Sequence, residues 1–339
     1  MSGKGFRLFV VGDNFSKTGP AIVTDSLIRN LPKETLYLKH KSKAARAFEI
    51  FFKMFPADAV VFSGFSRQNL YGMRLARLLG KKCAYLMHGC VEYENEINRE
   101  VDPSEARDER KMLSRADKIL AVSRQFEAWL KGRYPKEAHK IGHLTNGIDW
   151  DLMTEQPGPE ERDPLGVISV GGGMPRKRIL VICQAIQKLR REEELDITLT
   201  VAGDKGADSE AIEGFDFVKN AGLVPHDELM SLYRRNKLFV QNSCFETFGL
   251  APLEALLSQT DVLISEKCGA LSVIRKAEDC DVIHDTEDAD EIAGKILALL
   301  SGENHIRLIC ELDKESTSWK KRSRELLNIM KELAGQKTG

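Results

Sequence analysis

The sequence predicts an α/β protein made of two doubly wound domains, each built on a parallel sheet. Short apolar, β-rich runs alternate with amphipathic stretches along the whole chain, which is the pattern of βαβ units. The chain of 339 residues is longer than one hydrophobic core usually organises, and 42% of its residues are hydrophobic. A polar, proline-bearing stretch at 150–166 interrupts the alternation and is typical of a linker between domains.

The expected strands are runs of about four to eight apolar residues, which is typical of strands buried on both faces. In the N-terminal half they lie at 6–11, 34–38, 59–64, 83–89 and 118–123, and in the C-terminal half at 166–172, 197–203, 238–243 and 261–265. Helical periodicity occurs between them, at 23–31, 69–80, 110–117, 177–194 and 289–302. In such sheets ligands bind beyond the carboxyl ends of the strands.

The composition predicts a cytoplasmic protein with reduced thiols. No apolar run reaches the length of a membrane span, and the N-terminal sequence MSGKGFRLFVV does not resemble a signal peptide. The seven cysteines are an odd number and include no C-x-x-C pair. Packing roles are therefore expected for them rather than disulfides or a zinc site.

The net charge of −1 conceals an asymmetry along the chain. Residues 1–150 carry 26 Lys and Arg against 17 Asp and Glu, a balance of +9. Residues 151–339 carry 24 against 34, a balance of −10. The basic half predicts an anionic partner, either a phosphate-rich acceptor or a lipid surface. It carries no nucleic-acid recognition motif, so nucleic acid is not expected as a partner.

The stretch NSCFETFGLAPLEALLS places Glu246 and Glu254 eight positions apart. Glu246 follows an expected strand, so it should lie at that strand's carboxyl end. A helix is expected to begin between Gly249 and Pro252, because proline is favoured in a first helical turn. Glu254 should therefore lie in or near that turn.

Two interpretations of this motif are open. In one, Glu254 only complements the helix dipole, a contribution of about 0.3–1 kcal/mol. In the other, backbone amides around Phe248, Gly249 and Leu250 bind an anion, while both glutamates accept hydrogen bonds from hydroxyl groups on either side. A nucleotide sugar has that layout, with sugar hydroxyls, a diphosphate and ribose hydroxyls in order.

The pattern N-S-x-x-E-x-F-G-L-x-P-x-E-A-L resembles the defining motif of the retaining nucleotide-sugar glycosyltransferases of family 4. These enzymes have the GT-B fold, in which two Rossmann-like domains face a central cleft. The resemblance extends through NGID, VAGD, AGLVPHDELMSLYRRNKLFVQNS and SWKKRSRELLNIMKEL. It implies that Glu246 contacts the donor sugar and Glu254 the nucleotide ribose, and Leu223 is also expected at the donor.

The same resemblance gives the two domains their roles. Residues 1–157 are predicted to form the acceptor-side domain, and residues 158–317 the domain that binds the nucleotide sugar. In the family the last segment is a helix that crosses back to the N-terminal domain. Residues 318–339 are therefore expected to lie on the first domain.

The loop GGGMPRKR is a second candidate site. Gly172 and Gly173 follow a strand and allow close approach of backbone to phosphate, and Lys177 or Arg176 would neutralise the charge. The alternative is a turn with solvated cations. Similar enzymes carry an arginine early in this loop and a lysine later; Lys177 matches the lysine, but glycine stands where the arginine is expected. Arg176 or Arg178 is left as a substitute.

Two residues of the N-terminal half are also candidates. His88 ends an expected strand, where a lone histidine is often structural, but in similar enzymes a histidine at this place lies by the donor sugar. Gly19, in the first βα loop, is expected to approach the donor phosphate or the acceptor. The predicted catalytic residues are thus Glu246, His88 and Lys177.

No cofactor and no metal ligand is predicted. The triplets Asp149-x-Asp151, Asp279-x-Asp281 and Asp288-x-Asp290 fit a DxD metal motif only superficially, because such triplets arise freely in a chain with 30% charged residues. The charge of the diphosphate is expected to be met by Lys177 and helix dipoles.

The segment 41–55 should form an amphipathic helix with Phe48, Phe51, Phe52 and Phe55 on one face and Lys43, Arg46 and Lys53 opposite. In one interpretation the aromatic face packs on the sheet. In the other the helix lies on an anionic membrane, which would attach the protein peripherally to the inner face.

The expected activity is transfer of a hexose, with retention, from a nucleoside diphosphate sugar to a hydroxyl of a glycan or lipid-linked acceptor in cell-surface polysaccharide synthesis. Uridine is expected in preference to guanosine as the nucleoside of the donor. Two alternatives are a sugar-nucleotide 2-epimerase of the same fold and a catalytically silent glycosyltransferase-like subunit.

Overall fold

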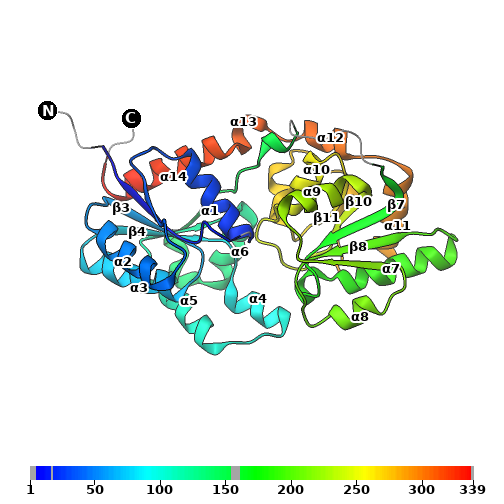
Figure 1. Ribbon diagram of the computed structural model, residues 1–339, viewed down its shortest axis with the longest axis horizontal. Helices are drawn as coiled ribbons and strands as arrows, with labels where there is room; N and C mark the ends of the chain where they lie inside the picture. Colours follow the sequence, from blue (N-terminus) through cyan, green and yellow to red (C-terminus); the bar gives the residue numbers. More distant parts are fainter. Residues whose placement is uncertain (1–4, 17, 154–160, 337–339) are drawn as a thin grey trace. The chain divides into compact units, whose positions relative to one another are not determined.

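The computed structural model describes residues 5–16, 18–153 and 161–336, and the chain divides into two compact units (Figure 1). Unit 1 comprises Met1–Tyr93, Asp102–Gly147 and Glu315–Gly339, and unit 2 comprises Glu94–Val101 and Ile148–Lys314. The expected boundary between residues 157 and 158 lies outside the described residues. Glu94–Val101 lies in the N-terminal half of the chain but clusters with unit 2, which the sequence does not predict.

Unit 1 contains a six-stranded parallel sheet in the order β2-β1-β3-β4-β5-β6. Its strands are β1 (Leu8–Val11), β2 (Leu36–Tyr37), β3 (Ala59–Ser63), β4 (Lys82–Met87), β5 (Lys118–Ala121) and β6 (Ile141–His143). Its helices are α1 (Gly19–Asn30), α2 (Lys43–Met54), α3 (Arg67–Leu78), α5 (Pro103–Arg115), α6 (Arg124–Arg133) and α14 (Trp319–Leu333), while α4 (Val91–Asn98) runs from unit 1 into unit 2. Every residue of β1 and β3 is buried, as the continuous apolar runs predict.

Serine side chains fix where three helices of unit 1 begin. The hydroxyls of Ser42, Ser66 and Ser123 accept hydrogen bonds from backbone amides in the first turns of α2, α3 and α6. Each bond satisfies a donor that the helix itself cannot pair.

Helix α14 packs against α1 within unit 1. The Ser323 hydroxyl donates to the Leu27 carbonyl at 3.1 Å. Trp319 covers Gly147, where a β-carbon would come within 2.5 Å of the indole. Only a residue without a side chain allows this approach.

Unit 2 contains a second six-stranded parallel sheet, in the order β12-β11-β10-β7-β8-β9. Its strands are β7 (Asp163–Val170), β8 (Thr198–Ala202), β9 (Val218–Gly222), β10 (Asn236–Gln241), β11 (Asp261–Ser265) and β12 (Val282–Ile283). Its helices include α7 (Ile179–Glu192), α8 (Ser209–Glu213), α9 (His226–Arg235), α10 (Ala251–Leu257), α11 (Ala289–Ser301) and α12 (His305–Cys310). The strand order reverses between β7 and β10, and such a switch point is where ligands bind in open parallel sheets. Two Rossmann-like sheets are therefore present, as the sequence predicts.

The interpretation that the aromatic face of α2 packs on the sheet is wrong. Phe48, Phe51, Phe52 and Phe55 are between 47% and 67% exposed. The face of α2 that packs on the protein is formed instead by the buried side chains of Ile50 and Met54.

Two of the three cations opposite the phenylalanines bind within the protein. Arg46 donates to the Gly12 carbonyl at 3.2 Å, and Lys53 donates to the Tyr37 carbonyl and pairs with Glu49. The hydrophobic period of the segment predicts its two faces correctly, but not which of them is covered.

No helix among the described residues is both long and apolar enough to cross a membrane.

Candidate active site

Glu246 is the centre of a buried ionic cluster in unit 2. It lies just beyond β10, where its backbone forms a bridge to Cys268. Lys177 Nζ donates to Glu246 Oε2 at 2.5 Å, and Arg176 Nη1 donates to the same oxygen at 3.2 Å. Gln241 Nε2 lies at 3.3 Å from it. The cluster joins the exit of β10 to the loop after β7.

This cluster keeps Glu246 ionised. Burial alone would raise its pKa, but the positive charges and hydrogen bonds of Lys177 and Arg176 lower the pKa to about 2. A carboxylate fixed in this way can accept hydrogen bonds from hydroxyl groups at any physiological pH.

Arg176, a suggested phosphate ligand, is paired within the protein in the described structure. Its side chain is 15% exposed, and Nη1 also donates to the Phe245 carbonyl at 3.3 Å, while Nε lies 3.8 Å from Glu94 Oε2. Its backbone carbonyl accepts from the Cys244 amide at 3.0 Å. Arg176 therefore clamps the Glu246 loop to the glycine loop.

Arg178, the other proposed substitute, pairs with Glu287 and donates to the Pro175 carbonyl. Both arginines are therefore paired with acids, and the alternative of a turn with solvated cations does not describe them. Lys177 is paired as well, with Glu246, and its assignment to the phosphate stays a prediction from the family resemblance.

The glycine loop is packed too closely for a side chain at its centre. Gly172 has φ of +55°, and a β-carbon there would lie 1.9 Å from the Asp204 carbonyl oxygen. A β-carbon on Gly173 would lie 2.0 Å from the Ser209 hydroxyl oxygen. The arginine expected from the resemblance has no space in this backbone conformation.

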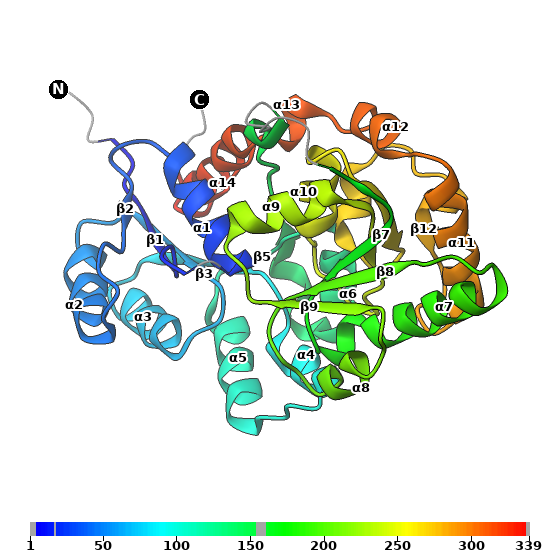
Figure 2. The same cartoon turned by 45° about the vertical axis from the view of Figure 1, so that its right-hand side comes forward.

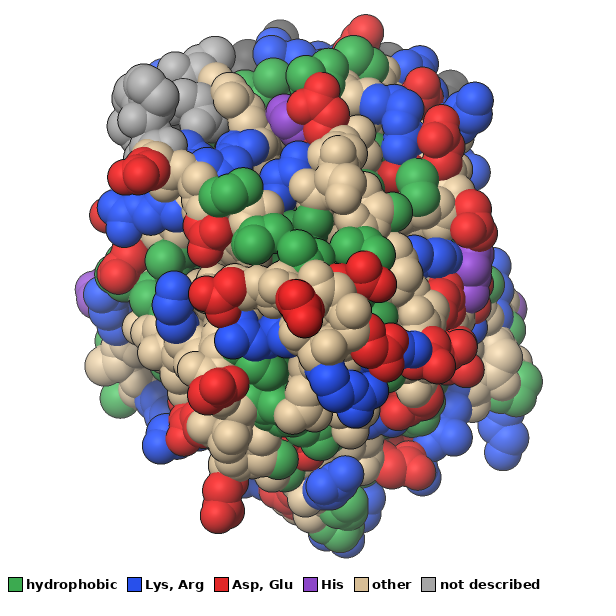
Figure 3. Space-filling model, turned by 90° about the vertical axis from the view of Figure 1, so that its right-hand side faces the viewer, with side chains coloured by type: hydrophobic (Ala, Val, Ile, Leu, Met, Phe, Trp, Pro, Cys, Tyr) green, Lys and Arg blue, Asp and Glu red, His purple; other side chains and the backbone are tan. Residues whose placement is uncertain are grey.

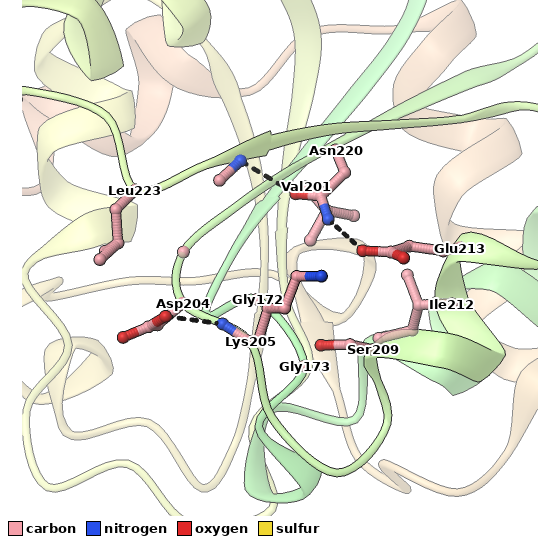
Figure 4. Close-up of a pocket in the computed structure, with 12 residues that line it drawn as sticks. Gly172, Gly173, Val201, Asp204, Lys205, Ser209, Ile212, Glu213, Asn220 and Leu223 are labelled. Carbon is pink, nitrogen blue, oxygen red and sulfur yellow. Dashed lines mark hydrogen bonds between the residues drawn. The ribbon is translucent and has the colours of Figure 1, made fainter.

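A pocket of about 160 Å³ opens at the carboxyl ends of β7, β8 and β9 (Figure 4). Gly172, Gly173 and Leu223 line it together with Asp204 and Lys205. Leu223 is 73% exposed, so it offers an apolar surface at the rim. Three predicted donor-binding residues from two separate motifs thus line one pocket.

Glu254 has a partner, His226, that is not among the residues predicted for the site. It lies in the first turn of α10, and His226 Nε2 is 3.4 Å from its Oε1. The hydrogen bond to Glu254 raises the pKa of His226 above its usual value. His226 stands within the quoted segment AGLVPHDELM, but a single histidine gives no sign of which acid it faces.

The turn between the two glutamates presents backbone donors. Gly249 has φ of +82°, a conformation that favours glycine. Within the described part of the chain, the amides of Phe248, Gly249 and Leu250 donate no hydrogen bond to protein. These are the amides that the sequence suggested for an anion.

The candidate residues of unit 1 belong to its first and fourth strand ends. His88 Nε2 lies 2.8 Å from the Ser63 hydroxyl, which is 2.7 Å from the Thr24 hydroxyl. Burial lowers the pKa of His88 to about 4, so the imidazole is neutral at pH 7. Gly19 is the first residue of α1, and a β-carbon there would meet no atom within 4 Å.

The DxD triplets carry out structural tasks. Asp281 is buried and pairs with Arg307 at 2.8 Å, and Asp288 caps α11. Asp149 accepts from the backbone of Asp151. Among the described residues, no group of three or more His, Cys, Asp and Glu is arranged to hold a metal ion.

Solved structures with the same fold confirm the architecture. Sucrose-phosphate synthase from Thermosynechococcus elongatus superposes with a TM-score of 0.69 at 16% identity, over 98% of this chain and 100% of that one. The Anabaena protein HepE, in complex with UDP and glucose, gives a TM-score of 0.71 at 12% identity, over 97% and 100%. Fold and sheet topology define a protein of the GT-B class.

The chain belongs to the glycosyl transferases group 1 family, whose model matches residues 154–325, just over half of its length. Residues 2–152 match a second model, Glycosyltransferase Family 4.

Curated relatives are distant. O-antigen chain mannosyltransferase B of Escherichia coli is 29% identical over 144 residues, which are 40% of this chain and 36% of that protein. D-inositol 3-phosphate glycosyltransferase of Arthrobacter sp. (strain FB24) is 25% identical over 233 residues, 63% of this chain and 55% of that protein. The chain thus spans between about a third and just over half of the length of these relatives.

Proposed function

We propose that this protein is a glycosyltransferase that moves a hexose from a nucleoside diphosphate sugar, preferably a UDP-sugar, to an acceptor hydroxyl with retention at the anomeric carbon. The observation that carries the proposal is the Glu246–Lys177 pair at the switch point of the sheet, in a chain of the glycosyl transferases group 1 family. Glu246 is assigned to the donor sugar, Lys177 to the diphosphate and Glu254 to the ribose.

The proposed mechanism uses the leaving group as the base. The acceptor oxygen forms a bond to the anomeric carbon as the bond from that carbon to the phosphate oxygen breaks. The departing diphosphate takes the acceptor's proton on the same face. Lys177 has three donor hydrogens, so it can hold Glu246 and the developing charge on the diphosphate together.

The acceptor is proposed to be a glycan or a lipid-linked sugar in cell-surface polysaccharide synthesis. The similarity to a mannosyltransferase of O-antigen chains supports this class of acceptor. The preference for UDP is supported by the fold shared with HepE, which was solved with UDP and glucose. A cytoplasmic location is proposed because all seven cysteines lie among the described residues and none forms a disulfide.

A thermal-shift screen against nucleotide sugars tests donor binding, because a ligand specific for the folded state stabilises it by mass action. UDP-sugars should raise the melting temperature, and Lys177→Ala should reduce the rise. The matched control is Lys188→Ala, which removes a partly exposed lysine paired with Asp290 and should leave the rise unchanged. Proton NMR of the product then reports the anomeric configuration. An inverted product would contradict retention.

A silent subunit is the second candidate, because no side chain fits where the second loop cation is expected. Donor binding without turnover towards any acceptor would favour it. Conversion of the donor to an epimer without acceptor would favour the 2-epimerase instead.

Transfer is proposed to need no divalent metal, since one carboxylate of each DxD triplet is already engaged: Asp288 caps α11, Asp281 pairs with Arg307 and Asp149 accepts from the Asp151 amide. Turnover should therefore persist in EDTA. Loss of turnover in EDTA that Mg²⁺ or Mn²⁺ restores would contradict this part of the proposal.

A further inference from the structure

Two neighbouring helices of unit 1 present an unusual surface, here called the α2–α3 face. It comprises the exposed side chains Phe48, Phe51, Phe52, Phe55, Tyr71, Leu78, Arg74 and Arg77. Helices α2 and α3 lie side by side (Figure 2). A β-carbon on Gly72 of α3 would lie 3.4 Å from Ile50 of α2, an ordinary contact distance.

The aromatic part of the face is a continuous stripe along α2. Phe48 stacks on Phe52 with ring centroids 6.3 Å apart, and Phe51 contacts both Phe52 and Phe55 edge to face at 5.3 and 5.2 Å. On α3, Leu78 is 84% exposed. Contiguous exposed apolar surface of this kind is rare on a protein with no partner, so a partner is expected to cover it.

The face displays no acidic side chain. The 12 residues of α2 and the 12 of α3 contain six Lys and Arg and a single acid, Glu49. The Glu49 carboxylate is turned inward, where it pairs with Lys53 and accepts from the backbone amides of Lys39 and His40. The charge presented outward is therefore positive.

Positive charge also collects at the edge of the face towards α5. Arg74 and Arg77 are exposed, and their positive charges lie near Arg115 of α5. Burial lowers the pKa of Arg115, and the repulsion from these two charges lowers it further. Nη1 of Arg115 is buried and has no hydrogen-bond partner in the described structure. Asp108, the acid that acts on Arg115, already pairs with Arg67 and Lys111. Three arginines held together in this way are suited to bind an anion.

We propose that the α2–α3 face docks on the surface of an anionic lipid bilayer, with the phenylalanines in the interface and the arginines on lipid phosphates. Aromatic rings beside cations and without exposed acids are what such a surface binds. A protein partner or a second copy of the chain would have to match the same row of phenylalanines with an acidic rim.

Docking in this way would place a predicted site loop across helix α2 from the bilayer. Arg46, on the opposite side of α2, donates to the Gly12 carbonyl at the start of the first βα loop, which contains Gly19. An acceptor embedded in the bilayer would then be presented on this side of unit 1. The lipid-linked acceptor rests on the proposed function, whereas the docking does not.

Flotation with lipid vesicles tests the proposal. The full chain should float with mixed phosphatidylglycerol and phosphatidylcholine vesicles at low salt, much less at high salt, and not with phosphatidylcholine alone. Phe48→Ser with Phe52→Ser, and separately Arg74→Gln with Arg77→Gln, should each lower the partition coefficient by about tenfold or more. Matched controls are Ile306→Ser, which removes an exposed apolar side chain of α12, and Arg191→Gln, which removes an exposed arginine of α7; neither should change flotation.

The thermal shift with UDP should be the same in all these variants, which shows that they are folded and keeps docking separate from donor binding. Absence of flotation with anionic vesicles at low salt would overturn the proposal. Sedimentation velocity without vesicles tests whether a second copy of the chain binds this face instead. A dimer that the phenylalanine substitutions dissociate would assign the face to that second copy. Release from vesicles by millimolar glycerol phosphate would assign the arginines to a free anion instead.

Discussion

Glu246 and Glu254 belong to one sequence motif, but the structure gives them separate partners. Glu246 is held by Lys177 and Arg176, and Glu254 by His226. No cation is shared between the two acids among these contacts. This separation is what opposite ends of one donor molecule would require.

We expect different kinetic effects from the two substitutions to glutamine. Glu246→Gln should lower kcat by about 10²-fold, because a contact that holds the reacting sugar in attack geometry acts on the transition state. Glu254→Gln should raise the donor KM, because the donor loses a hydrogen bond to a charged group, which typically contributes about 1.5–3 kcal/mol to binding. Calorimetry with UDP should show weaker binding for Glu254→Gln only. Equal losses of UDP affinity in both variants would contradict the assignment.

His88 should make the fold sensitive to acid. Its pKa is about 4 in the folded protein against 6.5 ordinarily, so between those values the unfolded chain binds a proton that the folded protein does not. The free energy of unfolding should therefore fall as pH drops from 6.5 to 4, by up to about 3 kcal/mol. Urea unfolding at both pH values measures this free energy. In His88→Gln it should fall by less between pH 6.5 and 4.

His226→Gln is the matched control for the His88 experiment. In the unsubstituted protein the pKa of His226 is raised, so protonated His226 stabilises the folded state below about pH 6.5, and this contribution is lost at higher pH. Its removal should cost stability on the acidic side. An identical acid loss in His88→Gln and wild-type protein would show that His88 is not the source.

At this scale the sequence predicts residue types but not their pairings. Glu246, Lys177 and the glycines could be selected from their motifs, and the structure brings the first two together. The ion pair of Arg176 with Glu94 could not be predicted, because Glu94 lies 82 positions earlier in the chain. The pairing of His226 with Glu254 could not be predicted from the sequence either.

The elements themselves were largely predictable, since strands buried on both faces leave continuous apolar runs. Three strands, β6, β9 and β12, were missed. The strands β6 and β12 are only three and two residues long, too short to show a period, and no residue of β9 is fully buried, so it has no continuous apolar run. The loop after β7 was predicted as a glycine turn, yet its packing against the loop after β8 depends on residues outside the motif.

That packing gives a test at two glycines. Gly172→Ala would place a β-carbon 1.9 Å from the Asp204 carbonyl oxygen at φ of +55°, so it should cost at least about 2 kcal/mol of stability and most UDP binding. Gly294→Ala, in α11 with no atom within 4 Å of the new β-carbon, should stabilise by about 0.5–1 kcal/mol. Urea unfolding compares them. A tolerated Gly172→Ala would show that the loop can move away from Asp204.

For the whole molecule, composition predicted two domains and an uneven charge, but not the full division of the chain. Residues 94–101 cluster with unit 2, where Asn98 accepts a hydrogen bond from the Arg176 amide and Arg99 pairs with Asp208. Contacts between residues so distant in sequence cannot be predicted from composition. The C-terminal half carries −10, yet acidic and basic side chains are interspersed over one face of the molecule (Figure 3). A net charge alone therefore did not identify a binding surface there.

The placement of the donor residues leads to a prediction for hydrogen exchange across the chain. Lys177, Glu254 and the pocket at Gly172, Gly173 and Leu223 all belong to unit 2. UDP should therefore slow amide exchange at 171–178, 201–209 and 246–254, by about tenfold or more, because bound loops open less often.

The helices α2 and α3 of unit 1 serve as the internal reference and should exchange at the same rate with and without UDP. Lys177→Ala should show weaker protection at 171–178 for the same UDP concentration, because it lacks the proposed cation for the diphosphate. Protection confined to unit 1, or none at saturating UDP, would mean that the glycine loop and pocket of unit 2 do not bind the nucleotide.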